Sequence, residues 1–532
     1  SVDQHYLVLS TPLSIPFAYE VTDGTGNVIF TGTISQNSPA TIVLEDFNFD
    51  HDVRGVIDED SLNTPVVADG LIITGQGAFF ASIRHKTSNQ ATILSSKGSL
   101  ALGTEFRAGH AFTRWRASQR NHFTSVMATE DSTIVKFHNP SVGYIGHTFG
   151  DTITVMLNEG ESYVIAQEIN SVYNGTESEF NGTHILSNHP VVVNSGTWLG
   201  GPITPAHDIG ADQIVPVNLA GNSYVFMHGE HSDLTREKVI IVATQDNTQL
   251  YFNGSPVPAT TLVNAGDYFI ADGGFWTVAG NMYLSCSAPI MAYQTVFADD
   301  ANDTQGMILV PPLNNCAGVK QIELSNIYLT GSDNVFLNII GKIGDTITIE
   351  HVGGTFTTSL TQATTNISAT APDNLWFTEK FELPNLPSMP GVPVHISVTS
   401  DSIVAVGITT NSGNAGAGGY FSGFARSPIL FGEDNGDLCV DGTETLSVIN
   451  SDVFIAYQWY FNGDSIPNSD TNAINVVLEG DYHVEGFTES CPGIAVASDI
   501  FLVDYLTCTP PDIFVSVNDT TVDEGAGTMT FT

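Results

Sequence analysis

The sequence predicts an all-β protein built from tandem antiparallel, β-sandwich-like repeat modules. Three observations lead to this prediction. Runs of β-branched residues bounded by turn formers recur along the chain, as in VVVNSGTW from Val191 and VIIVAT from Val239. No window carries apolar residues at helical spacing over three turns, so we expect helices to be nearly absent. Finally, two long stretches of the chain repeat each other.

The repeat consists of three matched elements that occur twice in the same order. The first pair agrees in Ala, Thr, Asp, Thr and Phe, the second is a Gly-Tyr hairpin sequence, and the third is an apolar run. They read VMATEDSTIVKF from Val126 and IVATQDNTQLYF from Ile241, LNEGESYVIA from Leu157 and LVNAGDYFIA from Leu262, and ILSNHPVVV from Ile185 and LSCSAPIMA from Leu284. Three matched elements in one order indicate repetition of a single β unit.

Looser echoes of the same unit start at Leu71 and Ile396, so we expect four related modules of about 100 residues each. Such a module is longer than a usual propeller blade, which favours separate sandwiches over blades around a common axis. The predicted modules span residues 1–105, 106–220, 221–320 and 321–431.

The charge balance and the lengths of the apolar runs argue against two classes of function. The chain has 15 Lys plus Arg against 57 Asp plus Glu, a formal net charge of -42. Such a field repels phosphate backbones and anionic lipid heads, so we expect no nucleic-acid binding. No apolar run has membrane-spanning length, so we expect no membrane insertion either. We expect an exported, extracellular protein, because its surface is acidic and its sequence starts at Ser1 without a leader.

An immunoglobulin-like β-sandwich is predicted for residues 432–507. Cys439 and Cys491 flank Trp459, which is the Cys, Trp, Cys order of a sandwich with one inter-sheet disulfide. If these two cysteines pair, the protein resides in an oxidising compartment.

The other three cysteines give a less specific pattern. Cys286 and Cys316 form a second predicted disulfide, and the alternative is two small buried thiols. Cys508 is left without an assigned partner.

The region from about residue 5 to residue 431 resembles a known family. It contains SSKGSLALGTEFRAG from Ser95, the TEDSTIVKF repeat, and ADQIVPVNLAGNSYVF from Ala211. These segments resemble the family named for the N-terminal domain of the IgG Fc-binding protein. Relatives of that family occur in large surface proteins of gliding bacteria that use the type IX secretion route. IgG binding itself does not transfer, because no residue here can be assigned to it.

Two C-terminal segments resemble repeats of large adhesins. VDEGAGTMTFT at residues 522–532 resembles the opening of a Calx-beta repeat, so residues 508–532 are interpreted as the start of a truncated Calx-beta-like domain. YQWYFNG around Trp459 resembles the immunoglobulin-like repeats of the same kind of protein. Together the resemblances imply the N-terminal head of a longer, repeat-built adhesin, with a possible role in gliding motility.

Basic residues concentrate in one stretch, which suggests a ligand site. Seven of the 15 basic residues are Arg84, Lys86, Lys97, Arg107, Arg114, Arg116 and Arg120. Arginines interleaved with aromatic rings suit bidentate capture of a carboxylate or sulfate with a sugar stacked on a ring. The candidate glycan-binding residues are Arg84, Arg107, Arg114, Trp115, Arg116 and Arg120. The alternative is that a chain with so many carboxylates pairs its few arginines internally.

Acidic loops are candidate cation sites. ADDAND from Ala298 places Asp299, Asp300 and Asp303 within a few residues, as a hard, oxygen-coordinated cation requires. The Calx-beta resemblance also implies calcium. The loop does not match an EF-hand pattern, and the alternative is a solvated turn.

The function that these features favour is binding outside the cell, and no catalytic residue is assigned. His207 beside Asp208 is interpreted as a satisfied loop pair, because no nucleophile or metal motif accompanies it. We expect an adhesin head that binds a surface polysaccharide or a partner surface protein through loops on a rigid scaffold. The alternatives are a secreted carbohydrate-active enzyme with β accessory modules and a structural docking module of a surface machine.

Overall fold

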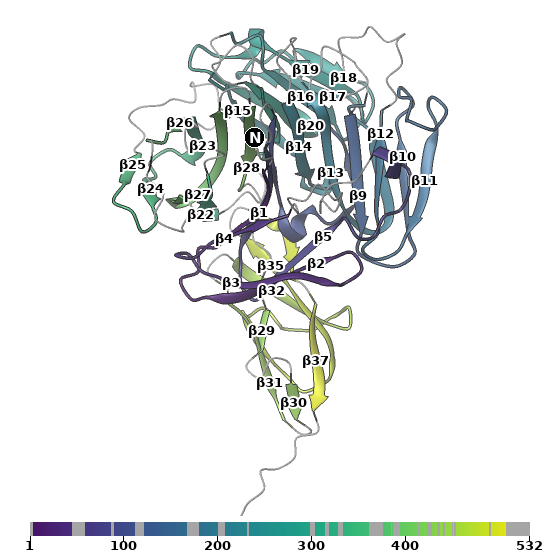
Figure 1. Cartoon of the computed structure of the whole chain (residues 1–532), viewed down its shortest axis with the longest axis vertical. Coiled ribbons are helices and arrows are strands. Elements are labelled where there is room, and N and C mark those ends of the chain that lie inside the picture. The colour runs from purple at the N-terminus through teal and green to yellow at the C-terminus, as the bar shows by residue number, and fades with distance from the viewer. Residues whose placement is uncertain are drawn as a thin grey trace, which may run out of the picture.

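The computed structural model is almost entirely β, which confirms the predicted fold class (Figure 1). Within the described residues, four short 3-10 turns interrupt the strands at Glu59–Ser61, Gly98–Ala101, Val217–Leu219 and Gly273–Phe275. No helix in the described part of the chain has the length and apolar character needed to cross a membrane. The structure describes residues 4–44, 59–86, 90–111, 122–167, 180–200, 208–230, 233–297, 304–313, 319–327, 334–360, 376–384, 386, 394–412, 415–422, 428, 430–432, 437–439, 442–449, 451, 454–488, 491–498 and 500–506.

The second module shows the repeated strand arrangement most clearly. Its strands are β8 (Gly103–Arg107), β9 (His122–Ala128), β10 (Thr133–His138), β11 (Thr152–Leu157), β12 (Ser162–Ala166), β13 (His184–Gly200) and β14 (Asp208–Ile214). The long strand β13 lies at the centre, and every pairing is antiparallel. Its first part pairs with β8 and β10, and its second part pairs with β9 and β14. β11 extends the sheet from β10, and β12 extends it from β9, so each half ends in an outer strand.

The third and fourth modules repeat this topology strand for strand. The third contains β15 (Gly221–Met227), β16 (Lys238–Ala243), β17 (Thr248–Phe252), β18 (Thr260–Leu262), β19 (Tyr268–Ala271), β20 (Asn281–Phe297) and β21 (Thr304–Leu309). The fourth contains β22 (Val319–Ser325), β23 (Asn334–Lys342), β24 (Ile347–His351), β25 (Thr357–Leu360), β26 (Trp376–Glu382), β27 (His395–Ser412) and β28 (Ala415–Tyr420). β20 and β27 take the place of β13.

The first module is a variant in which the long strand is split in two. Its strands are β1 (Gln4–Ser10), β2 (Phe17–Asp23), β3 (Val28–Ile34), β4 (Ala40–Val43), β5 (Leu71–Gly75), β6 (Phe80–Lys86) and β7 (Ala91–Ser95). β5 pairs with β2, while β6 pairs with β1 and β7, so β5 and β6 together occupy the place of β13. A counterpart of β8 is not found among its described residues. The exact residue boundaries between the modules stay a prediction.

The repeated sequence elements are joined by the same hydrogen bonds in two modules. In the second module, Thr129 donates its hydroxyl to the Pro190 carbonyl over 2.7 Å, and the Glu159 amide donates to the Asp131 carboxylate over 3.1 Å. The third module repeats both bonds at 2.6 Å and 2.8 Å, through Thr244 to Pro289 and through Ala265 to Asp246. The shared Thr and Asp therefore link the first repeated element to the third and to the second, respectively.

The last strands of the four modules surround a common axis. β7, β14, β21 and β28 contact one another in cyclic order, and we call the assembly of the four modules the module ring. Glycines allow this close approach: a Cβ at Gly210 would lie 2.9 Å from the Met307 amide nitrogen of the next module. The all-β, sandwich-like class is as predicted, but the preference for separate sandwiches over an arrangement around one axis was wrong, because the last strands of the four modules pack together.

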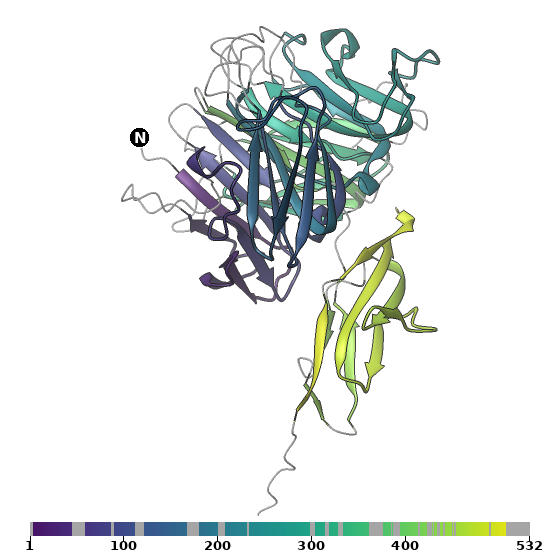
Figure 2. The same ribbon diagram turned by 90° about the vertical axis from the view of Figure 1, so that its right-hand side faces the viewer.

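A separate C-terminal lobe lies beside the module ring (Figure 2). Its strands are β29 (Leu430–Gly432), β30 (Asp437–Cys439), β31 (Glu444–Val448), β32 (Phe454–Phe461), β33 (Asp464–Ser465), β34 (Ala473–Val476), β35 (Gly480–Thr488), β36 (Cys491–Ala497) and β37 (Phe501–Leu506). They form a three-stranded and a six-stranded sheet. Trp459 is completely buried in the core of this lobe and donates its indole N–H to the Thr471 carbonyl over 2.8 Å.

The structure corrects the predicted disulfide between Cys286 and Cys316. Cys286 lies in β20 as a buried free thiol, because its side chain packs in the apolar core of the third module. Cys316 lies outside the described residues, as do the side chains of Cys439 and Cys491, so the disulfide between Cys439 and Cys491 stays a prediction.

Cys286 is expected to be unreactive in the folded protein. Burial raises the pKa of its thiol to about 12, so the reactive thiolate is scarce at neutral pH and the sulfur is also shielded. Iodoacetamide should label the Cys286 peptide only after denaturation, as measured by peptide mass spectrometry. Equal labelling rates in native and denatured protein would contradict this burial.

Candidate binding face on the second module

The predicted basic ligand site is partly used for internal contacts. Arg84 is buried in β6 of the first module, where its guanidinium donates to the Asn326 carbonyl and lies 5.8 Å from the centre of the Phe421 ring. Burial lowers its pKa to about 10. Because Asn326 and Phe421 belong to the fourth module, Arg84 connects the first module to the fourth and so helps to close the module ring.

Arg107 lies where the second module contacts the third. It ends β8 and donates to the Gly182 carbonyl over 3.4 Å. Burial lowers its pKa, while Glu105 and Asp246 act in the opposite direction, and Asp246 belongs to the third module. Arg84 and Arg107 thus contact different pairs of modules, and the structure does not bring them together in one site.

The other predicted site residues lie outside the described part of the chain. These are Arg114, Trp115, Arg116 and Arg120 of the glycan site, and Asp299, Asp300 and Asp303 of the calcium site. Both sites stay predictions.

A buried polar cluster in the second module was missed by sequence reasoning. His110 Nε2 lies 3.0 Å from the Ser195 hydroxyl, which donates to the Gly109 carbonyl over 2.7 Å. Both side chains are fully buried, and desolvation lowers the pKa of His110 to about 3. A histidine of such low basicity is neutral at physiological pH, and Ser195 directs its proton to a backbone carbonyl. This geometry fits an internal hydrogen-bond network.

An exposed apolar strip lies on the outer face of the second module. β10 alternates between buried and exposed residues, so that Ile134 faces solvent with 41% of its surface exposed. Met156 on β11 lies directly opposite Ile134 and is 64% exposed. Leu186 on β13 lies opposite Lys136 and is 39% exposed. We call Ile134, Met156 and Leu186 the apolar strip.

The same positions are polar in the third module. The residues Gln249 and Thr261 pair there as Ile134 and Met156 do in the second, and Ser285 takes the place of Leu186. Because the same strand topology forms without these apolar side chains, the fold does not require the strip. Exposed apolar residues that a scaffold does not need are typical of interaction sites.

The strip borders a sheet edge with which no further described strand pairs. β11 is the outer strand of its half of the sheet, and Figure 1 shows it at the periphery of the molecule. Its sequence, TITVML, contains neither a charged residue nor proline, which are common protections of edge strands. In the third and fourth modules the corresponding edges are shorter, with three residues in β18 and four in β25, whereas β3 of the first module has seven. Among the three modules with an unbroken central strand, β11 is therefore the longest of these edges.

A comparison with known protein families identifies the family of this chain. A family model described as IgGFc binding protein matches residues 90–379, which is more than half of the 532 residues. The chain belongs to this family. The match runs from β7 into β26 and so includes the apolar strip and β11, and it confirms the predicted resemblance over that region.

Comparison with other proteins adds no further argument. No curated protein matches the sequence. Among solved structures, invasin, a bacterial integrin-binding protein, is 11% identical with a TM-score of 0.12, and the alignment covers 80% of this chain and 76% of invasin. A biofilm-associated protein BSP domain is 9% identical with a TM-score of 0.12, covering 77% of this chain and 97% of that domain. At these scores the superpositions support no conclusion about this family member.

Proposed function

We propose that this family member is the extracellular head of a surface adhesin, and that it binds a partner protein at the β11 edge of the second module. The observation that carries the proposal is the apolar strip beside an unprotected edge strand, at positions where the third module has polar residues. The family description, which names an immunoglobulin fragment as a ligand, supports a protein as the class of partner.

The mode of binding that suits this site is addition of a strand. An extended segment of the partner would pair with β11 through main-chain hydrogen bonds, which supply affinity without regard to sequence. Alternate side chains of that segment would pack on Met156 and Ile134, which would supply specificity. The net charge of -42 would in addition favour a partner with a positive surface.

A charge placed in the strip is expected to weaken binding. Met156→Glu would place a carboxylate against the apolar side chains of the partner, and the affinity should fall at least about tenfold, or ~1.4 kcal/mol. The measurement is surface plasmon resonance of the full chain against a panel of extracellular proteins that includes immunoglobulin Fc.

Thr261→Glu is the matched control, because Thr261 holds the equivalent position in the third module. It should bind as the unchanged protein does. If the unchanged chain binds no panel member, or if both variants lose affinity equally, the proposed edge site is wrong.

The remaining assignments extend this proposal. The two sheets around Trp459 support an immunoglobulin-like spacer in the C-terminal lobe. The Calx-beta resemblance falls on residues 508–532, outside the described residues. Gliding motility, type IX secretion, glycan binding and calcium stay predictions.

A further inference from the structure

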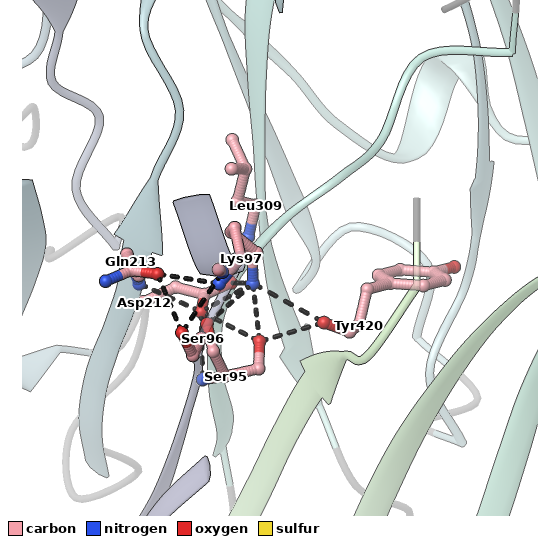
Figure 3. Close-up of polar contacts among 8 residues, drawn as sticks. Ser95, Ser96, Lys97, Asp212, Gln213, Leu309 and Tyr420 are labelled. Carbon is pink, nitrogen blue, oxygen red and sulfur yellow. Dashed lines mark hydrogen bonds and ion pairs between the residues drawn. The ribbon is translucent and has the colours of Figure 1, made fainter. Parts of the chain in front are cut away.

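The centre of the module ring contains a lysine and an aspartate in direct contact (Figure 3). Lys97 follows β7 of the first module, and Asp212 lies in β14 of the second. The Lys97 Nζ lies 2.9 Å from Asp212 Oδ1 and 3.0 Å from Oδ2. The lysine side chain is 2% exposed and the aspartate side chain 0%, so bulk water does not reach the pair.

The carboxyl group is held by donors from three strands. At Oδ1, the carboxyl group accepts hydrogen bonds from the Ser95 hydroxyl at 3.0 Å and from the main-chain N–H of Gln213 at 3.0 Å. At Oδ2, it accepts from the Leu309 amide of the third module at 3.1 Å. The Ser95 hydroxyl also contacts Lys97 Nζ, and thus touches both the amine and the carboxyl group.

Burial favours the neutral form of each partner. Desolvation lowers the pKa of Lys97 and raises the pKa of Asp212, although their mutual attraction opposes both changes. Proton transfer within the pair yields a free amine beside a carboxylic acid. A neutral amine is a nucleophile, and a protonated carboxyl group can lose water, whereas the ionised pair can do neither.

We propose that Lys97 and Asp212 condense to an amide bond that covalently joins the first and second modules. In this step the Nζ lone pair attacks Cγ, and negative charge develops on Oδ2, where the Leu309 N–H is aimed. The Nζ–Cγ bond forms, a proton passes from Nζ through the Ser95 hydroxyl to Oδ1, and the Cγ–Oδ1 bond breaks. One water molecule leaves, and no oxidant or cofactor is consumed.

Two other lysine–carboxylate pairs in the described part of the chain lack these conditions. Lys238 lies 3.2 Å from Asp272, whose side chain is 53% exposed. Lys380 lies 3.4 Å from Glu230, and the lysine side chain is 23% exposed. Contact with water keeps such pairs ionised, so we expect neither to condense. These pairs serve as internal controls in the same molecule.

Mass spectrometry of the unchanged full chain tests the proposal without a variant. After reduction and denaturation, its intact mass should fall short of the sequence mass by one water molecule. Protease digestion should yield a branched peptide that contains both Lys97 and Asp212. A mass equal to that of the sequence, or a loss of water located in an unbranched peptide, would overturn the proposal.

Three variants refine the test. Lys97→Arg and Asp212→Ala should both show the full sequence mass and no branched peptide. Ser95→Ala keeps the lysine and the aspartate but lacks the hydroxyl, so the crosslinked fraction should fall. An undiminished crosslink in Ser95→Ala would overturn the role of Ser95 as the positioning residue for proton transfer.

Discussion

Replacing Lys97 by alanine is expected to destabilise the module ring strongly. The substitution would leave the Asp212 carboxylate buried among the central strands without its cation. Removal of one member of a buried ion pair costs about 3–5 kcal/mol, because the remaining group must either stay charged without compensation or be held protonated by burial. If the two residues form an amide, the same substitution also removes a covalent link, which acts in the same direction. Chemical denaturation of the full chain, followed by intrinsic fluorescence, measures the loss.

Two comparisons show whether burial of the pair causes the loss of stability in Lys97→Ala. Lys238→Ala removes a lysine whose partner Asp272 is largely exposed, and such pairs contribute about 0–1 kcal/mol. The double variant Lys97→Met with Asp212→Leu removes both polar groups and should recover much of the stability that Lys97→Ala loses. Similar losses for Lys97→Ala and Lys238→Ala would show that the buried pair does not hold the central strands together.

Repetition made the likeness between the modules predictable. The Thr, Asp and Pro positions shared by the two sequence repeats form equivalent hydrogen bonds, so matched sequence corresponded to matched structure. In the TEDST and TQDNT segments, Ser132 and Asn247 both adopt a φ of 58°, a left-handed conformation in the turns from β9 to β10 and from β16 to β17. Local turn chemistry is visible in a sequence because its partners are near neighbours.

The central pair could not be predicted in the same way. Lys97 belonged to the basic stretch and Asp212 to the ADQIVPVNLAGNSYVF segment, but the two residues are separated by 115 positions. Their contact depends on the close approach of β7 and β14, which the preference for separate sandwiches did not include. The apolar strip was missed for a related reason: TITVML reads as an ordinary strand until the topology shows that β11 is an edge.

Replacing Gly160 by alanine is expected to disrupt the joint between the first and second modules. Gly160 lies in the second repeated element with a φ of +77°, and a Cβ there would lie 1.9 Å from the Gly24 carbonyl oxygen. The substitution therefore combines left-handed backbone strain of about 1–2 kcal/mol with an overlap against backbone atoms that cannot rotate away. We expect a total loss above about 3 kcal/mol, measured by chemical denaturation.

Gly26→Ala provides the matched control for the overlap. Gly26 has a φ of +79° in the hairpin between β2 and β3, but no atom lies within 4 Å of an added Cβ. The Gly26→Ala variant should lose only the stability that corresponds to backbone strain, about 1–2 kcal/mol. Gly182 in the next joint resembles Gly160, because its Cβ would lie 1.9 Å from the Gly266 carbonyl oxygen. If all three alanine variants lose the same stability, contact between neighbouring modules contributes little, and the ring depends on its central strands.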